Sequence, residues 1–373
     1  MRDAFKHLTF VAGALSACLA FSAAAMAQDN STVQGDKSVN VESENAVIND
    51  TEAKEAVENS FTRETGWYPK LRIGGSAALN WNRNVDGVND GTAFSFGVNI
   101  KGALDGVYKN LEWQNKLDIE HQQTKTPNID HWIKSTDKFD FQSLLLFRIP
   151  GAEWVGPFAR FRLQSSLLPG YYSTDKDVVV RFYEYGTKID AKEDSAITKV
   201  RALAAQDQIK LSSSFEPLLL SESAGFFISP YSTEMLNVNF TVGVAGQHLI
   251  ARDGKDAGYV GFDDDDDDAY YDVIQLKDTN SFGVEGQLSL NGVFVGYVNW
   301  SLSGSLYYPF VMDEDHGLKD EELIHSDIEA KISVKMASWA SLDYALTAKL
   351  HPFVSQEWQL TNTLLFNIGF DVF

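Results

Sequence analysis

Long runs of alternating apolar and polar residues recur through most of this 373-residue chain. The segment 323–336 is one example. Its even-numbered positions are almost all apolar, whereas its odd-numbered positions carry an imidazole, two carboxylates and two amines. Successive side chains of a β-strand point to opposite faces, so such a run predicts a strand with one apolar and one polar face.

The alternating runs are long. They exceed the 5 or 6 residues typical of globular strands (about 17–20 Å) and reach the roughly 9 to 11 residues that a tilted strand needs to cross a bilayer. We predict twelve strands, at residues 70–82, 92–103, 108–121, 132–148, 154–166, 204–215, 221–242, 280–291, 293–308, 323–336, 339–350 and 358–373. Splitting 221–242 at Ser229-Pro230 would give thirteen, an odd number that bacterial single-chain barrels do not use.

Long alternating strands predict an all-β fold, a transmembrane antiparallel β-barrel of about twelve strands with up-and-down topology. Lipid offers no hydrogen-bond partners, so a spanning backbone must pair with itself, and a closed barrel does so. A soluble periplasmic sandwich or barrel also alternates, but aromatic residues near the predicted strand ends favour the membrane interpretation because they suit interfacial girdles. These aromatics are Trp67, Tyr68, Trp81, Trp132, Trp154, Tyr307, Tyr308, Trp339 and Trp358.

The links between the predicted strands fall into two classes that segregate to opposite ends. The short links are 104–107, 149–153, 216–220, Asn291-Gly292 and 337–338. The long links are 83–91, 122–131, 167–203, 243–279, 309–322 and 351–357. Short periplasmic turns opposite long outer loops are typical of outer-membrane barrels.

The N-terminal residues 1–27 have the form of a secretory signal peptide, with a short basic start, an apolar run and "AMA" before a cleavage point. A rival interpretation is a lipobox at "LSAC", which would leave Cys18 lipidated. Residues 28–66 are polar and predict a flexible arm. Residues 67–373 form the predicted barrel, and cleavage after Ala27 would leave no cysteine.

The formal net charge of −21 and the lack of Lys/Arg clusters argue against a nucleic-acid partner. We expect the chain to be exported to the cell outer membrane. Its expected partners are the lipid bilayer, lipopolysaccharide and the general outer-membrane assembly machinery.

The polar row of each predicted strand would line the lumen. The candidate lumen-facing residues are Arg72, Lys101, Glu112, Lys116, Asp118, Glu120, Arg160, Arg162, Glu285, Asp327, Glu329, Lys331, Lys335, Asp343 and Lys349. Both signs are present, which favours paired charges and a narrow or filled lumen over a single-sign selective porin. Twelve strands lie between the filled eight-stranded barrels and the open sixteen-stranded ones. The function expected is thus a narrow pore or a structural barrel that presents acidic loops outward.

Four short stretches resemble the uncharacterised outer-membrane β-barrel family known as domain of unknown function 3078. They are "KSTDKFDFQSLLLFRI" (134–149), "FRLQSSLLPGYYS" (161–173), "FFISPYSTE" (226–234) and "FNIGFDVF" (366–373). The resemblance implies a barrel of about twelve strands and carries no assigned activity. The terminal Phe373 is one residue out of phase with the apolar row from Leu364 to Val372.

The sequence gives only weak indications of metal binding. The acidic run "FDDDDDDAYY" (262–271) would lie in an outer loop and could associate weakly with divalent cations. "MDEDHGLKDEE" (312–322) places its glycine one position too early for an EF-hand. We therefore expect no metal site, no cofactor and no enzyme.

Two alternatives remain at this stage. A lipid-modifying barrel could use His121 or His131 with Ser135. A transporter of an apolar ligand could open laterally near Gly225 and Pro230, because proline removes a ladder hydrogen bond.

Overall fold

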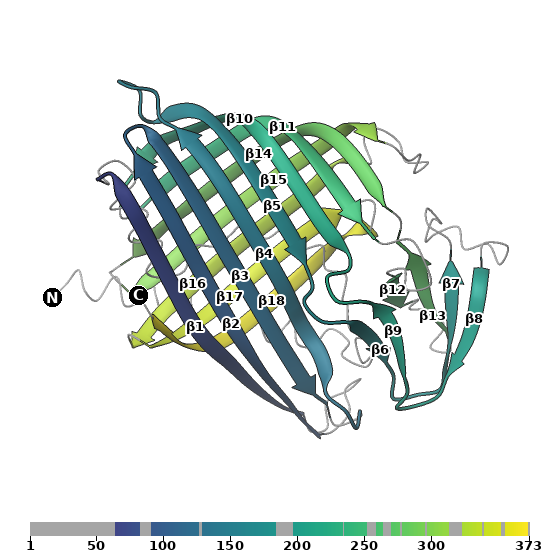
Figure 1. The fold of residues 1–373 in the computed structure, drawn as a ribbon. Helices are drawn as coiled ribbons and strands as arrows, with labels where there is room; N and C mark the ends of the chain where they lie inside the picture. Colours follow the sequence, from purple (N-terminus) through teal and green to yellow (C-terminus); the bar gives the residue numbers. More distant parts are fainter. Residues whose placement is uncertain are drawn as a thin grey trace.

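The computed structural model has a closed barrel of twelve antiparallel strands as its main body (Figure 1). It describes residues 64–82, 91–126, 129–183, 197–233, 235–251, 259–263, 270–276, 278–294, 297–312, 323–337, 339–351 and 355–371. The predicted signal peptide, nearly all of the N-terminal arm, and residues 264–269 of the acidic run lie outside these ranges.

The barrel strands are eleven to eighteen residues long. They are β1 (Gly66–Asn82), β2 (Gly91–Tyr108), β3 (Leu111–Lys125), β4 (Ile133–Phe147), β5 (Val155–Ser165), β10 (Leu218–Ser232), β11 (Asn237–Ile250), β14 (Thr279–Phe294), β15 (Val298–Met312), β16 (His325–Ala337), β17 (Ala340–His351) and β18 (Ser355–Asp371). Each strand pairs with its neighbour along the chain, and β1 closes the ring on β18 from Arg72↔Asp371 to Ser76↔Asn367.

Most short and long links lie at opposite ends of the barrel, as predicted, with two exceptions. The predicted short link 216–220 leads from the module into β10 at the end with the long links, and the link 352–354 at that end is only three residues long. The links at one end are 109–110, 148–154, 233–236, 295–297 and 338–339, while the other end carries 83–90, 126–132, 166–217, 251–278, 313–324 and 352–354. The first barrel strand starts, and the last one finishes, at the end with the short links (Figure 1).

The outer surface of the barrel is apolar. On β2, Phe94, Phe96 and Val98 are all exposed, and on β18 so are Leu364, Phe366, Ile368 and Phe370. Water does not stabilise such a continuous apolar exterior, whereas lipid does, and a closed antiparallel barrel lets the spanning backbone pair with itself. The predicted fold class is therefore confirmed, and the protein is an integral outer-membrane β-barrel.

Exposed aromatic side chains mark both rims of this apolar belt. At the short-link end, Trp67 packs edge-on against Trp113 at 5.9 Å between ring centroids, and Trp339 is also exposed. At the other end, Trp132 packs against Phe96 at 5.0 Å. These are the positions at which lipid headgroups meet the acyl chains. No helix in the described part of the chain is long and apolar enough to cross a membrane.

The number of strands agrees with the prediction through two errors that cancel. The predicted strand 204–215 is not in the barrel, since it contains only β9 (Gln208–Ser212), which pairs elsewhere. The predicted strand 221–242 is two strands, β10 and β11, joined by the link 233–236. The predicted turn Asn291-Gly292 lies inside β14, where a Cβ at Gly292 would meet the Met235 carbonyl oxygen at 2.0 Å. This glycine allows a neighbouring turn to approach and does not itself form one.

Two of the long links fold into a separate β-module beside the barrel (Figure 1). Its strands are β6 (Gly170–Ser173), β7 (Val178–Tyr183), β8 (Ile197–Leu203), β9, β12 (Tyr259–Asp263) and β13 (Tyr270–Gln275). They form a four-stranded sheet, β12-β13-β7-β8, and a two-stranded sheet, β6-β9. Val180 and Val273 are fully buried in its core, and Tyr172 stacks on Tyr271 with ring centroids 3.6 Å apart. The module therefore has a hydrophobic core of its own, which the sequence-based prediction of plain loops missed.

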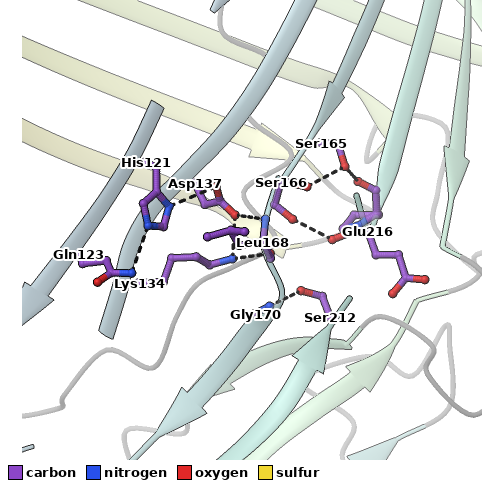
Figure 2. A network of polar contacts seen from close by, with 11 residues as sticks. His121, Gln123, Lys134, Asp137, Ser165, Ser166, Leu168, Gly170, Ser212 and Glu216 are labelled. Carbon is purple, nitrogen blue, oxygen red and sulfur yellow. Dashed lines mark hydrogen bonds and ion pairs between the residues drawn. The ribbon is translucent and has the colours of Figure 1, made fainter. Parts of the chain in front are cut away.

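Polar contacts attach this module to the outer surface of the barrel (Figure 2). Asp137 on β4 accepts a 2.7 Å hydrogen bond from the Leu168 backbone N–H and contacts the Lys134 ammonium at 3.1 Å. Lys134 also donates to the Leu168 carbonyl at 2.9 Å. Ser166 donates to the Glu216 carbonyl at 3.1 Å, which joins the segment entering the module to the segment leaving it.

Candidate functional site: the barrel lumen

The lumen is lined by the polar row of each barrel strand. On β16, Ile328 is exposed on the outer surface while Asp327 is buried on the inner one. The same alternation places all fifteen predicted lumen residues in the inward-facing rows of β1, β2, β3, β5, β14, β16 and β17. The geometry thus brings together side chains that are far apart in the sequence.

Ion pairs run along the wall formed by β3, β4 and β5. Lys138 contacts the Asp118 carboxylate at 3.0 Å. Arg162 makes a two-point contact with Asp140, and its Nε lies 3.0 Å from Oδ1. Side chains of the Arg162–Asp140 pair are only 10% and 7% exposed, so each charge depends on the other for its solvation. Charge-assisted, bidentate pairs of this kind fix side-chain direction as well as charge.

Arg160 reaches across two strands to β14. Its Nε donates to Ser223 at 3.2 Å, and its two terminal nitrogens donate to Gln287 and Glu285. The inward positions of the strands it crosses are small, with Ser223 opposite Ala245 and Gly225 opposite Gly243. The guanidinium therefore lies along the wall and is neutralised by Glu285.

A second charged wall follows on β16 and β17. Asp343 accepts hydrogen bonds from Ser333 and, at 2.7 Å, from Asn367, and the Lys331 ammonium lies 3.8 Å away. Asp327 stands opposite Lys349 in the β16–β17 ladder and accepts a 3.4 Å hydrogen bond from Ser305 of β15. The lumen charges of this wall are also held by neighbours on adjacent strands.

Sequence reasoning missed three charged residues that line or border the lumen. Lys138 and Asp140 alternate with the outward-facing Phe139 and Phe141, so the period-2 pattern could have identified them. Arg148 lies just beyond β4, outside the alternating run, and contacts Glu112 at 3.1 Å. Its position depends on the conformation of the link after β4, which the alternation does not predict.

Glu222, His248 and Asn280 form a polar cluster on the outer surface, just above the apolar belt. The two nitrogens of the His248 ring each lie 2.7 Å from a partner, Glu222 on one side and Asn280 on the other. Below them on the same outward rows lie the apolar residues Val244 and Phe282.

The histidines proposed for a lipid-modifying reaction do not pair with Ser135. The His121 ring contacts Asp137 at 3.4 Å and Gln123 at 3.2 Å on the outer surface (Figure 2). His131 pairs with Ser173 of the module at 3.0 Å instead of with Ser135, and Ser173 is 1% exposed. A serine so buried serves the junction between module and barrel.

Pro230 marks an irregularity at the short-link end of β10. The β10–β11 register shifts between Ile228 and Tyr231, while β10 pairs with β5 without a break from Leu219 to Ile228. The proline therefore lies beyond the part of β10 that closes against β5. Leu146, Phe158 and Phe227 form a small apolar cluster on the lumen side nearby.

No protein-family model and no curated protein matches the chain. Among solved structures, it is similar to an outer membrane channel from Pseudomonas putida F1, with 8% identity and a TM-score of 0.37 over 84% of this chain and 97% of that chain. The chain is also similar to the translocator domain of the autotransporter NalP from Neisseria meningitidis, with 9% identity and a TM-score of 0.35 over 85% of this chain and 92% of that chain. A third similar structure is the NanC porin, with 7% identity and a TM-score of 0.33 over 80% of this chain and 97% of that chain. TM-scores this low do not assign a function, so the function proposed below is derived from the lumen of this chain. The resemblance to domain of unknown function 3078 remains a prediction.

Proposed function

We propose that the protein is a narrow, passive pore across the outer membrane. The observation that carries this proposal is the polar inner surface of a closed twelve-stranded barrel. About eight strands enclose a space that side chains fill, and sixteen to eighteen leave an open channel. Twelve strands lie between these two cases, and small inward residues such as Ser223, Gly225 and Gly243 support a lumen that is not completely filled.

The pairing of the lumen charges supports a pore of weak charge selectivity. Arg162 with Asp140, Lys138 with Asp118 and Arg160 with Glu285 each combine opposite signs on the wall. Paired charges produce a weaker field along the axis than a ring of one sign would. The long arginine side chains are also held against the wall and do not extend toward the axis.

Planar-bilayer conductance tests this proposal directly. Purified, folded protein should give discrete conductance steps in potassium chloride, with a reversal potential near zero in a salt gradient. Added neutral polymers of increasing size should suppress the conductance up to a cut-off that measures the pore width. Heat-unfolded protein in the same detergent is the control, and a folded barrel that stays silent would contradict the proposal.

The outer surface supports contact with lipopolysaccharide as part of the same proposal. The hydrogen-bonded cluster of Glu222, His248 and Asn280 lies at the upper edge of the apolar belt, where lipid headgroups begin. Assembly of the barrel would use the general outer-membrane machinery, and the acidic run at 262–271 would attract divalent cations weakly.

A further inference from the structure

The lumen has one wall that is almost free of charge. On β15, every inward position from Asn299 to Tyr307 is asparagine, serine or tyrosine. On the inward rows of β10, β11, β14 and β15, the described residues carry a single ionisable carboxylate, Glu285, and Arg160 neutralises it. The opposite side of the lumen, from β16 through β1 to β5, carries the remaining charged rows.

Nine uncharged polar side chains form a three-by-three grid on this wall, which we call the amide–hydroxyl face. The register aligns three rows across β11, β14 and β15: Asn237–Asn291–Ser301, Asn239–Ser289–Ser303 and Thr241–Gln287–Ser305. Rows two residues apart are spaced by about 6.5–7 Å and strands by about 4.8 Å. The face therefore measures on the order of 13 by 10 Å.

Two members of this face have polar atoms that no described residue satisfies. Asn291 is 3% exposed, and neither its amide nitrogen nor its amide oxygen has a hydrogen-bond partner among the described residues. The same holds for the Thr241 hydroxyl within the described part of the chain. Burying such groups without partners is unfavourable, so a hydrogen-bonding molecule that reaches them from the lumen would relieve this cost.

We propose that the amide–hydroxyl face binds and guides an uncharged, polyhydroxylated solute, such as a sugar or a polyol, through the pore. This inference rests on the proposed pore function. Hydroxyl and amide groups can both donate and accept, so they can replace the water around a sugar hydroxyl at little cost. Weak contacts spread over several sites allow a solute both to enter and to leave. Charged walls would instead hold ions and their hydration shells.

Liposome swelling compares matched solutes directly. Proteoliposomes should admit glucose faster than gluconate or glucosamine, which are similar in size but carry a charge. The variants that test the face are Thr241→Val and Asn291→Leu, which keep the shape and remove the polar atoms. We expect each to slow glucose entry by about two- to tenfold, the effect of losing a hydrogen bond of ordinary strength. Potassium chloride conductance should change little.

Thr347→Val is the control, because Thr347 lies on the charged wall of β17, opposite Glu329. It should leave glucose entry unchanged. If wild-type protein conducts ions but admits glucose no faster than its charged analogues, or if Thr241→Val and Asn291→Leu change nothing, this inference fails while the pore remains. If wild-type protein does not conduct, the pore itself fails. Removing an unsatisfied buried hydroxyl should not unfold the barrel, so Thr241→Val remains informative even if Asn291→Leu assembles poorly.

Discussion

At the scale of single residues, the lumen is organised by side chains that neutralise one another. Arg160 and Glu285 are 125 residues apart in sequence, and the barrel brings β5 and β14 close enough for them to pair. The sequence predicts that both side chains face inward. It cannot predict this pair, because Arg160 reaches past two intervening strands only where their inward residues are as small as Ser223 and Gly243.

Removing Glu285 should release Arg160 as an uncompensated cation. In Glu285→Gln the lumen gains one net positive charge, so the reversal potential in a potassium chloride gradient should shift toward chloride selectivity. The double variant Arg160→Gln/Glu285→Gln should return it to the wild-type value. An unchanged reversal potential in the single variant would show that this charge does not face the ion path.

The Arg162–Asp140 pair should be important for stability. Asp140→Asn leaves a nearly buried guanidinium without its counter-charge, a change that costs about 3–5 kcal/mol. The free energy of unfolding can be measured by urea titration in lipid vesicles. Glu222→Gln is the matched control. The side chains of Glu222 and His248 are 54% and 37% exposed, so their ion pair should contribute no more than about 1 kcal/mol to the free energy of unfolding. Equal losses in the two variants would contradict the burial argument.

At the scale of elements, alternation predicts the faces of each strand better than it predicts which strands form the barrel. The predicted run 204–215 does alternate, but Ile209 and Leu211 of β9 are buried in the module and face no lipid. A strand with one apolar face has the same pattern in both settings. The link between β10 and β11 contains no glycine or proline, and Pro230 three residues upstream is the stronger but misleading signal.

The two faces of β16 should respond oppositely to substitution. Ile328 is exposed on the outer surface midway along the strand, opposite Gly304 and Ala348. Ile328→Asp places a charge in lipid and should reduce the yield of folded barrel in vesicles. Glu329→Gln keeps a polar group on the lumen side and should fold normally, changing at most the conductance. The reverse result would mean that the faces are assigned the wrong way round.

The module should unfold without loss of the barrel. Val180→Asp buries a carboxylate in the module core at a cost of several kcal/mol. The module strands should then become sensitive to protease, while the barrel keeps its folded mobility on a semi-native gel. Val200→Asp on β8, where the side chain is 57% exposed, should leave both parts intact. Loss of the folded barrel in Val180→Asp would show that the two parts fold as one unit.

For the molecule as a whole, the ring closes where the first strand pairs with the last. The β1–β18 seam pairs over five residues, from Arg72 to Ser76, whereas β1 pairs with β2 over its full length from Gly66 to Asn82. The seam is thus the shortest ladder of the barrel, and closure depends on few hydrogen bonds there. The described residues of the apolar row on β18, from Leu364 to Phe370, face lipid as the sequence predicts.

A disulfide across the seam should lock the ring. Ile73 and Phe370 are directly opposed and both face outward, so Ile73→Cys/Phe370→Cys places two thiols within bonding geometry. The oxidised variant should resist conversion to the linear form on heating in detergent, and reduction should restore conversion. Ile73→Cys/Leu364→Cys, six residues out of register, should not cross-link. Failure of the opposed pair to oxidise would contradict this register.

The count of twelve agrees with the prediction only because two errors cancel, and the segregation of short from long links has exceptions. Alternation in the sequence does predict most of the barrel strands and the two faces of each. It does so because the side-chain period of a strand is a local property of the backbone. The packing of the whole chain determines which apolar faces meet lipid and which form the module core. It alone pairs Arg160 with Glu285 and aligns Asn237, Asn291 and Ser301 in one row, because these contacts depend on register and curvature summed over many strands.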